Sequence, residues 1–203
     1  MFHLEFGIFD LGFTMMEIVT TQQRQKIHPH KFVMWVAIGS LVMMFAGLTS
    51  AFIVKSNQPG WKDVKVPQVF WYSTIVILAS SLTVQMALRS FKQRELSHYR
   101  MLIAVTFILG SVFVLLQWIG FSNLWEQGIR LKGSGAAQFL YVIFGLHALH
   151  VIGGIIALLV MFIKAFFGKT KSYNSIPVEV AATYWHFVDL LWVYLFVFFM
   201  WIK

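Results

Sequence analysis

The chain has 203 residues, of which 59% are hydrophobic and only 12% are charged. This composition is far more apolar than that of an ordinary soluble domain, so water is not the main solvent of the protein. The lack of cysteine excludes disulfides, thiolate metal sites and iron–sulfur clusters. The net charge of +8 does not indicate a nucleic-acid partner, because the Lys and Arg residues are divided between apolar blocks.

The first 31 residues precede any apolar block long enough to cross a membrane. Phe6, Phe9 and Phe13 have roughly helical spacing, which is typical of an amphipathic helix lying in the membrane interface. The same residues are compatible with a tail that becomes ordered only against a partner. We therefore expect an N-terminal tail, residues 1–31, followed by one transmembrane domain, residues 32–203.

Five apolar blocks follow in the sequence, and each is long enough to cross a membrane. A bilayer core of about 30 Å requires about 20 helical residues. We predict membrane spans at residues 32–54, 69–89, 100–122, 138–163 and 180–202. The predicted fold is an all-α, polytopic membrane bundle of five transmembrane helices.

The distribution of basic residues predicts the orientation of these spans. Ten of the 16 Lys and Arg residues lie in the N-terminal tail and in the second and fourth loops. Because cytoplasmic segments carry an excess of Lys and Arg, the N-terminus is predicted to be cytoplasmic. An odd number of spans then places the C-terminus in the periplasm.

Polar residues gather in the last two predicted spans. In the fourth, His147 and His150 are three residues apart and share a helix face, which Gly153 and Gly154 continue. Small residues allow two membrane helices to approach closely, and imidazoles can then form hydrogen bonds between them. This face is predicted to pack against a neighbouring helix.

The fifth span carries Glu179, His186 and Asp189 at spacings of seven and three residues, so all three share a face. Asp189 lies about 15 Å from one end of this helix, and His150 lies about 21 Å from the corresponding end of the antiparallel fourth span. A contact between His150 and Asp189 is therefore feasible.

The residue types alone leave three interpretations open. Three histidines and two carboxylates in the two spans are compatible with a metal or haem site. Intramembrane carboxylates also form proton or ion paths, here through Glu179, His186 and Asp189. The third interpretation is a hydrogen-bonded clamp between helices that performs no chemistry.

These residues also form a recognisable signature. The fourth span contains His147-x-x-His150-Val151-x-Gly153, and Glu179 is followed by Tyr184-Trp185-His186-Phe187-Val188-Asp189-x-x-Trp192. This pattern resembles subunit III of the haem-copper terminal oxidases, the cytochrome c and quinol oxidase family, in its short five-span bacterial form. Weaker similarity, including Phe45-Ala46-Gly47 and Leu115-Leu116-Gln117, extends the resemblance over about residues 32–203.

The resemblance implies a non-redox subunit of a proton-pumping terminal oxidase in the bacterial inner membrane. Haem and copper would belong to partner subunits I and II, so it implies no catalytic, cofactor-binding or metal-binding residue in this chain. The candidates for a structural or proton-relay role are then His147, His150, Glu179, Tyr184, Trp185, His186, Asp189 and Trp192, with Gly153 and Gly154 as close-packing positions. Family members pack on subunit I, bind phospholipid, and sustain proton uptake and turnover stability. Membership of a larger respiratory supercomplex is a further expectation.

Two departures from the family pattern limit what can be carried over. Longer members have an intramembrane Glu just before the Phe-x-Gly of the first span, where this chain has Ser-Leu-Val-Met-Met at residues 40–44. It also lacks the first two family spans, which form one wall of a lipid-filled cleft. The alternative functions are an accessory subunit of a nitric oxide reductase, a small ion transporter and a haem-binding cytochrome.

Overall fold

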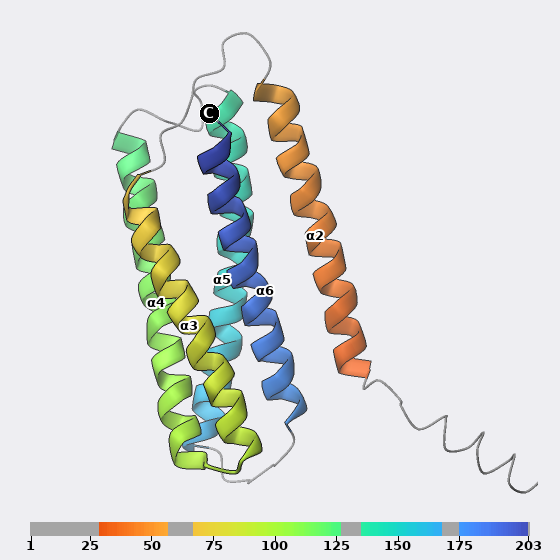
Figure 1. The fold of residues 1–203 in the computed structure, drawn as a ribbon, viewed down its shortest axis with the longest axis vertical. Helices are drawn as coiled ribbons and strands as arrows, with labels where there is room; N and C mark the ends of the chain where they lie inside the picture. The colour runs from red at the N-terminus through yellow and green to blue at the C-terminus, as the bar shows by residue number, and fades with distance from the viewer. Residues whose placement is uncertain (1–28, 57–66, 127–134, 168–174, 203) are drawn as a thin grey trace, which may run out of the picture.

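The computed structural model describes residues 29–56, 67–126, 135–167 and 175–202. These residues form five helices that run alternately up and down (Figure 1). They are α2 (Pro29–Ser56), α3 (Val69–Lys92), α4 (Leu96–Glu126), α5 (Gly135–Phe167) and α6 (Ile176–Trp201). All five are long and apolar enough to cross a membrane.

The prediction of an all-helical protein with five membrane-spanning helices is confirmed. The helices cover the predicted spans and extend beyond most of their ends by a few residues, whereas α6 ends one residue early, at Trp201. Backbone N–H and C=O groups must be hydrogen-bonded within the helix as long as they are in the hydrocarbon. A helix that continues a few residues past the apolar stretch meets this requirement at both membrane surfaces. Of the predicted N-terminal tail, only residues 29–31 fall in a described helix, and residues 1–28 lie outside the described ranges.

A tight turn joins α3 to α4. The Gln93 amide donates to the carbonyl of Arg89, and the Glu95 amide donates to the carbonyl of Ser90. Between them Arg94 has a φ of 64°, in the left-handed region where helices usually end with glycine. This turn sets the two helices side by side and antiparallel.

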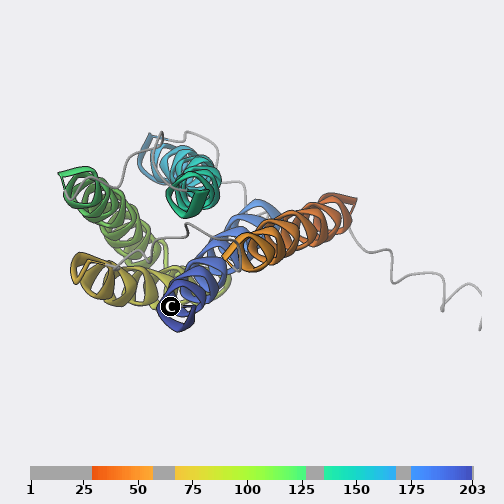
Figure 2. The same ribbon diagram turned by 90° about the horizontal axis from the view of Figure 1, so that it is seen from above.

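Helix α2 lies at the edge of the bundle, next to α6 (Figures 1 and 2). Within the described residues it touches α5 and α6 but neither α3 nor α4. Its buried side chains, Ile38, Phe45, Thr49 and Phe52, follow one stripe at spacings of seven, four and three residues. Thr49 exchanges a hydrogen bond of 2.9 Å with the hydroxyl of Tyr194 on α6. Most of the other α2 side chains are exposed, and many of these are apolar, including Phe32, Trp35 and Met43.

The core lies among α3, α4, α5 and α6, and its centre is aromatic. The ring of Trp192 on α6 lies 5.8 Å from Phe70 on α3, 5.3 Å from Phe113 on α4 and 5.5 Å from Phe144 on α5, measured between centroids. All four side chains are buried. Aromatic rings at these separations attract one another in addition to burying area, so one residue joins four helices.

Candidate functional site

Trp185 lies about two helical turns from Trp192 on α6, at a second point where the same four helices meet. Its indole Nε1 donates a hydrogen bond of 3.0 Å to the Ser80 hydroxyl of α3. The ring lies against Gly110 of α4 and Gly154 of α5, where an added Cβ would stand 2.9 Å from ring atoms in both cases. A helix carrying any larger residue at these two positions could not approach the indole so closely. Trp185 is thus fixed by packing on two sides and by a hydrogen bond on a third.

The two glycines predicted to allow close packing are not equivalent. At Gly154 an added Cβ would collide with the Trp185 ring, whereas at Gly153 it would meet the Tyr184 hydroxyl at 3.8 Å, an ordinary contact. Gly110 was not among the predicted residues, although its environment is as tight as that of Gly154. Glycine is common in membrane helices, so the sequence alone does not show which glycine is needed for close packing. The structure shows it by what an added Cβ would meet.

Helix α3 supplies most of the hydrogen-bonding partners for α6. Trp192 Nε1 donates to the Thr74 hydroxyl at 3.0 Å, and the His186 ring bonds to Ser81 and Gln85. The polar site residues predicted from the sequence all lie in the last two spans, and none of them is on α3. The available signal was the repetition of adjacent hydroxyl residues at 73–74 and 80–81, seven positions apart and therefore on one helix face.

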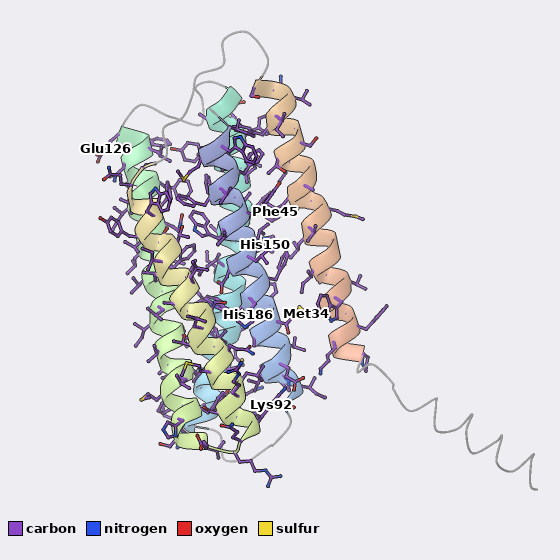
Figure 3. The ribbon with its side chains drawn as sticks, in the orientation of Figure 1. Met34, Phe45, Lys92, Glu126, His150 and His186 are labelled. Carbon is purple, nitrogen blue, oxygen red and sulfur yellow. The ribbon has the colours of Figure 1, made fainter. Side chains whose placement is uncertain are left out.

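His186 is held at both ring nitrogens. Its Nδ1 lies 2.6 Å from the Ser81 Oγ, and its Nε2 lies 3.2 Å from the Gln85 Oε1. An amide oxygen only accepts hydrogen bonds, so Nε2 carries the hydrogen that is donated to Gln85. In a neutral imidazole Nδ1 is then the acceptor, and the Ser81 hydroxyl donates to it. Figure 3 shows His186 on the α6 side that faces α3.

Asp189 is buried one turn beyond His186, with 3% of its surface exposed. Within the described part of the chain, neither carboxylate oxygen has a hydrogen-bond partner. The Ser81 hydroxyl of α3 bonds to His186, one turn away on α6. An isolated charge in such a position is costly, which makes Asp189 the most unusual polar group in the bundle.

The contact between His150 and Asp189 that the sequence made feasible is not formed. The His150 Nδ1 lies 2.7 Å from the Leu146 carbonyl of its own helix, and the Tyr184 hydroxyl donates to the His150 carbonyl at 3.0 Å. Within the described residues Asp189 has no hydrogen-bond partner, and the hydrogen bond that joins α5 to α6 is the one from the Tyr184 hydroxyl to the His150 carbonyl.

His147 and His150 share a helix face but have different surroundings. His147 is 2% exposed among Phe113 and Trp192, with ring centroids 6.5 and 5.4 Å away, and neither of its nitrogens has a hydrogen-bond partner in the described ranges. His150 is half-buried and faces α2, where the Phe45 ring meets it edge-on at 6.0 Å (Figure 3). The three-residue spacing therefore does not produce a two-histidine ligand set.

Glu179, in the first turn of α6, joins three helices at one end of the bundle. Its carboxylate lies 2.5 Å from the Lys31 Nζ of α2 and 3.0 Å from the Lys92 Nζ of α3. A carboxylate is favourable at a helix N-terminus, and Lys92 is favourable in the last turn of α3. Figure 3 shows Lys92 at this end of the molecule. Glu179, His186 and Asp189 thus have separate partners and form no continuous hydrogen-bonded chain within the described residues.

The geometry disperses the groups that were candidates for metal binding. Within residues 29–56, 67–126, 135–167 and 175–202, no cluster of three or more His, Asp or Glu side chains could hold a metal ion. The arrangement instead connects the helices to one another, through indoles, hydroxyls, one imidazole and one carboxylate. Polar contacts between apolar helices are a common means of fixing the packing of a membrane bundle.

These features define a multi-pass helical membrane protein whose polar interior connects its helices. Residues 20–203 match the family model for cytochrome c oxidase subunit III. The chain therefore belongs to the cytochrome c oxidase subunit III family, and the resemblance seen in the sequence is confirmed. The family is that of a membrane subunit of an enzyme complex, a respiratory oxidase.

Individual relatives agree with the family model. The chain is 30% identical over 164 residues to the probable cytochrome c oxidase subunit 3 of Mycobacterium tuberculosis (strain ATCC 25618 / H37Rv), covering 78% of this chain and 81% of the relative. It is 27% identical over 166 residues to cytochrome c oxidase subunit 3 of Bacillus sp. (strain PS3), covering 80% of each chain. The probable subunit 3 of Mycobacterium leprae (strain TN) is 31% identical over 168 residues, covering 81% of this chain and 82% of the relative.

Proposed function

We propose that this chain is the non-redox subunit III of a proton-pumping haem-copper terminal oxidase in the bacterial inner membrane. The observation that carries the proposal is the family match over residues 20–203, which includes the motif residues that build the core. Haem and copper would be held by subunits I and II, and the complex would reduce oxygen to water. This chain would contribute no electron-transfer group.

The role of the chain would be architectural and electrostatic. It would pack on subunit I, bind phospholipid at its apolar surface, and support proton uptake and turnover stability. Two observations favour this role over independent chemistry: the motif tryptophans are locked between helices, and the charged cluster of Glu179, Lys31 and Lys92 lies at one end of the bundle. By the positive-inside rule, that end would face the cytoplasm, where protons enter.

A mild-detergent pull-down through a tag on this chain tests the proposal. We expect subunits I and II to co-purify, with haem and copper visible in a reduced-minus-oxidised spectrum and with oxygen consumption by the eluate. Subunit mass spectrometry identifies the partners and any additional supercomplex components. A colourless single chain, or an eluate that consumes nitric oxide but not oxygen, would overturn it.

A further inference from the structure

The outer seam between α3 and α6 is lined by side chains that recur every seven residues on both helices. All of them are exposed or half-buried, and residues seven apart lie on one face of a helix. Helix α2 does not cover this seam, because in the described residues it contacts α6 on another side and does not reach α3 (Figures 1 and 2). The side chains of the seam are Trp71, Leu78 and Gln85 on α3 and His186, Val193 and Met200 on α6.

The seam opens near the end of α6 into an apolar groove of about 440 Å³. Trp71 and Phe196 form part of its wall, with their rings edge-on at 5.0 Å between centroids. The one hydroxyl in the lining belongs to Thr74, which accepts from Trp192 and donates to the Phe70 carbonyl. An apolar side chain therefore fits this groove better than a polar one. The rest of the lining is Val193, Val197, Met200 and Trp201.

Farther along the seam, Gln85 presents a hydrogen-bond donor to the outside of the chain. Its Oε1 accepts from the His186 Nε2 at 3.2 Å, and no acceptor for its NH₂ group is found in the described ranges. The amide nitrogen is not one of the buried polar atoms that lack a partner, so it reaches the protein surface. One end of this amide is thus used inside the bundle, and the other end is available to a neighbour.

The depth of Gln85 restricts which neighbour can use this donor. Helix α3 has 24 residues, about 36 Å, and exceeds a hydrocarbon core of about 30 Å by only a few ångströms at each end. Gln85 is seven residues, about 10 Å, from the end of α3 at Lys92, so its amide lies within the hydrocarbon. Lipid tails offer no acceptor at this depth, and an unpaired amide there is costly. A side chain on another membrane helix is the neighbour that can supply one.

Arg89 adds a positive charge to the same strip, one turn beyond Gln85. It is exposed and has no ion pair within the described residues, whereas Lys92, the next cation along α3, is paired with Glu179. A partner that carries a carboxylate at this end of the seam would match the charge of Arg89.

We propose that the seam is the docking surface for a transmembrane helix of another subunit, which places a bulky apolar side chain in the groove and an acceptor beside Gln85. The inference rests on the proposed function, because it takes the partner from the same membrane complex. Thr74 in the groove and Gln85 are 11 residues apart on α3, about 16 Å, so the two anchors on the partner are about three turns apart. A period of seven suits the small left-handed crossing angle common among membrane helices.

The test is photo-crosslinking in the purified complex in lipid nanodiscs, with the photoreactive residue benzoylphenylalanine replacing Leu78. Leu78 is exposed and lies between the groove and Gln85, so the change leaves the core intact. We expect a crosslink to a transmembrane segment of a co-purified subunit, and mass spectrometry should find an acceptor side chain about two turns from the crosslinked position. The same replacement at Leu115, an exposed leucine on α4, is the control and should not capture this segment.

Two pairs of variants test the anchors separately. Gln85→Leu should weaken binding of the captured subunit in detergent about threefold, the effect of one hydrogen bond between membrane helices. Ser81→Ala removes the other hydrogen bond of the same imidazole and should leave binding unchanged. Val197→Trp fills the groove from an exposed position and should weaken binding further, whereas Ile156→Trp at an exposed position of α5 should not.

The outcomes separate this inference from the oxidase assignment. If partner subunits co-purify but position 78 crosslinks only to lipid or to a second copy of this chain, the docking surface is overturned and the oxidase assignment stands. Equal binding by Gln85→Leu and Ser81→Ala would overturn the contact at Gln85. A chain that purifies without any partner would overturn both proposals.

Discussion

The Trp185 indole donates to the Ser80 hydroxyl at 3.0 Å, and this single bond is the centre of the connection between α6 and α3. The tryptophan enters a slot that is walled by glycines from two other helices. The packing gives a reason for the tryptophan in the signature, because the glycines of α4 and α5 leave room for its ring and Ser80 accepts its N–H.

The slot around Trp185 predicts the effect of adding a single methyl group. Gly154→Ala should destabilise the bundle by about 1–3 kcal/mol, because a Cβ there would stand 2.9 Å from the ring and force it or α5 to move. Gly145→Ala on the same helix is the control, since nothing lies within 4 Å of its added Cβ. Thermal unfolding in detergent measures both. Equal midpoints for the two variants would contradict the close approach seen at Gly154.

The hydrogen bond to Trp185 predicts a second loss of stability. Ser80→Ala leaves the buried indole N–H without its acceptor, and we expect a cost of about 1 kcal/mol, within the range found for polar contacts between membrane helices. Ser111→Ala is the comparison, because the Ser111 hydroxyl donates only to the Phe107 carbonyl of its own helix. Tryptophan fluorescence during denaturation reports the difference. A Ser80→Ala protein as stable as Ser111→Ala would show that the bond contributes nothing net.

The ion cluster at Glu179 predicts how α2 is held at that end. Glu179→Gln removes the partner of both Lys31 and Lys92, at a cost of about 0.2–1 kcal/mol for each partly exposed pair. We expect the first turns of α2 to separate from α6. The chain lacks native cysteine, so spin labels at Phe32→Cys and Leu190→Cys can measure the distance between the two helices directly.

In this experiment the distance distribution should broaden in Glu179→Gln and remain narrow in Glu95→Gln. Glu95 is exposed and lies near His98 of its own segment, so its loss leaves α2 untouched. An unchanged distribution in Glu179→Gln would mean that the apolar stripe alone positions this end of α2.

The turn between α3 and α4 predicts a stabilising substitution. Arg94 has a φ of 64°, a conformation that costs a residue with a Cβ about 1 kcal/mol relative to glycine. Arg94→Gly should therefore raise the unfolding midpoint. Gln93→Gly should lower it, because Gln93 has a φ of −78° and gains nothing from glycine. A decrease in both variants would indicate that the Arg94 side chain supplies more than the backbone loses.

The number of helices could be read from the sequence because length and hydropathy determine whether a segment crosses the membrane. Which residues meet could be predicted only in part. His147, Tyr184, Trp185, His186, Asp189 and Trp192 do line the polar and aromatic interior, as their concentration in two spans indicated. The contact between His150 and Asp189 that the spacing made feasible is not formed, and His186, Trp185 and Trp192 bond to α3, since a face that carries polar residues does not specify which neighbour it turns to.

The sequence gives little indication that the other residues of the site have a specific role. Ser81 and Gln85 of α3 are uncharged and stand in an apolar run, where serine and glutamine often bond to their own backbone or to nothing specific. Gly110 likewise resembles any other glycine of a membrane helix. The pairing of Glu179 with Lys31 and Lys92 joins residues more than 80 positions apart, and a count of basic residues per loop contains no information about such pairs.

The narrow stripe by which α2 is attached has a consequence for assembly. The core around Trp185 and Trp192 is completed by α3, α4, α5 and α6 alone, and the described part of α2 touches only the outer surface of α5 and α6. Helices inserted individually into a bilayer find their neighbours in a later step. Helix α2 precedes α5 and α6 in the chain, yet these two helices supply all of its contacts with the other described helices, so α2 can dock only after both of them have entered the membrane.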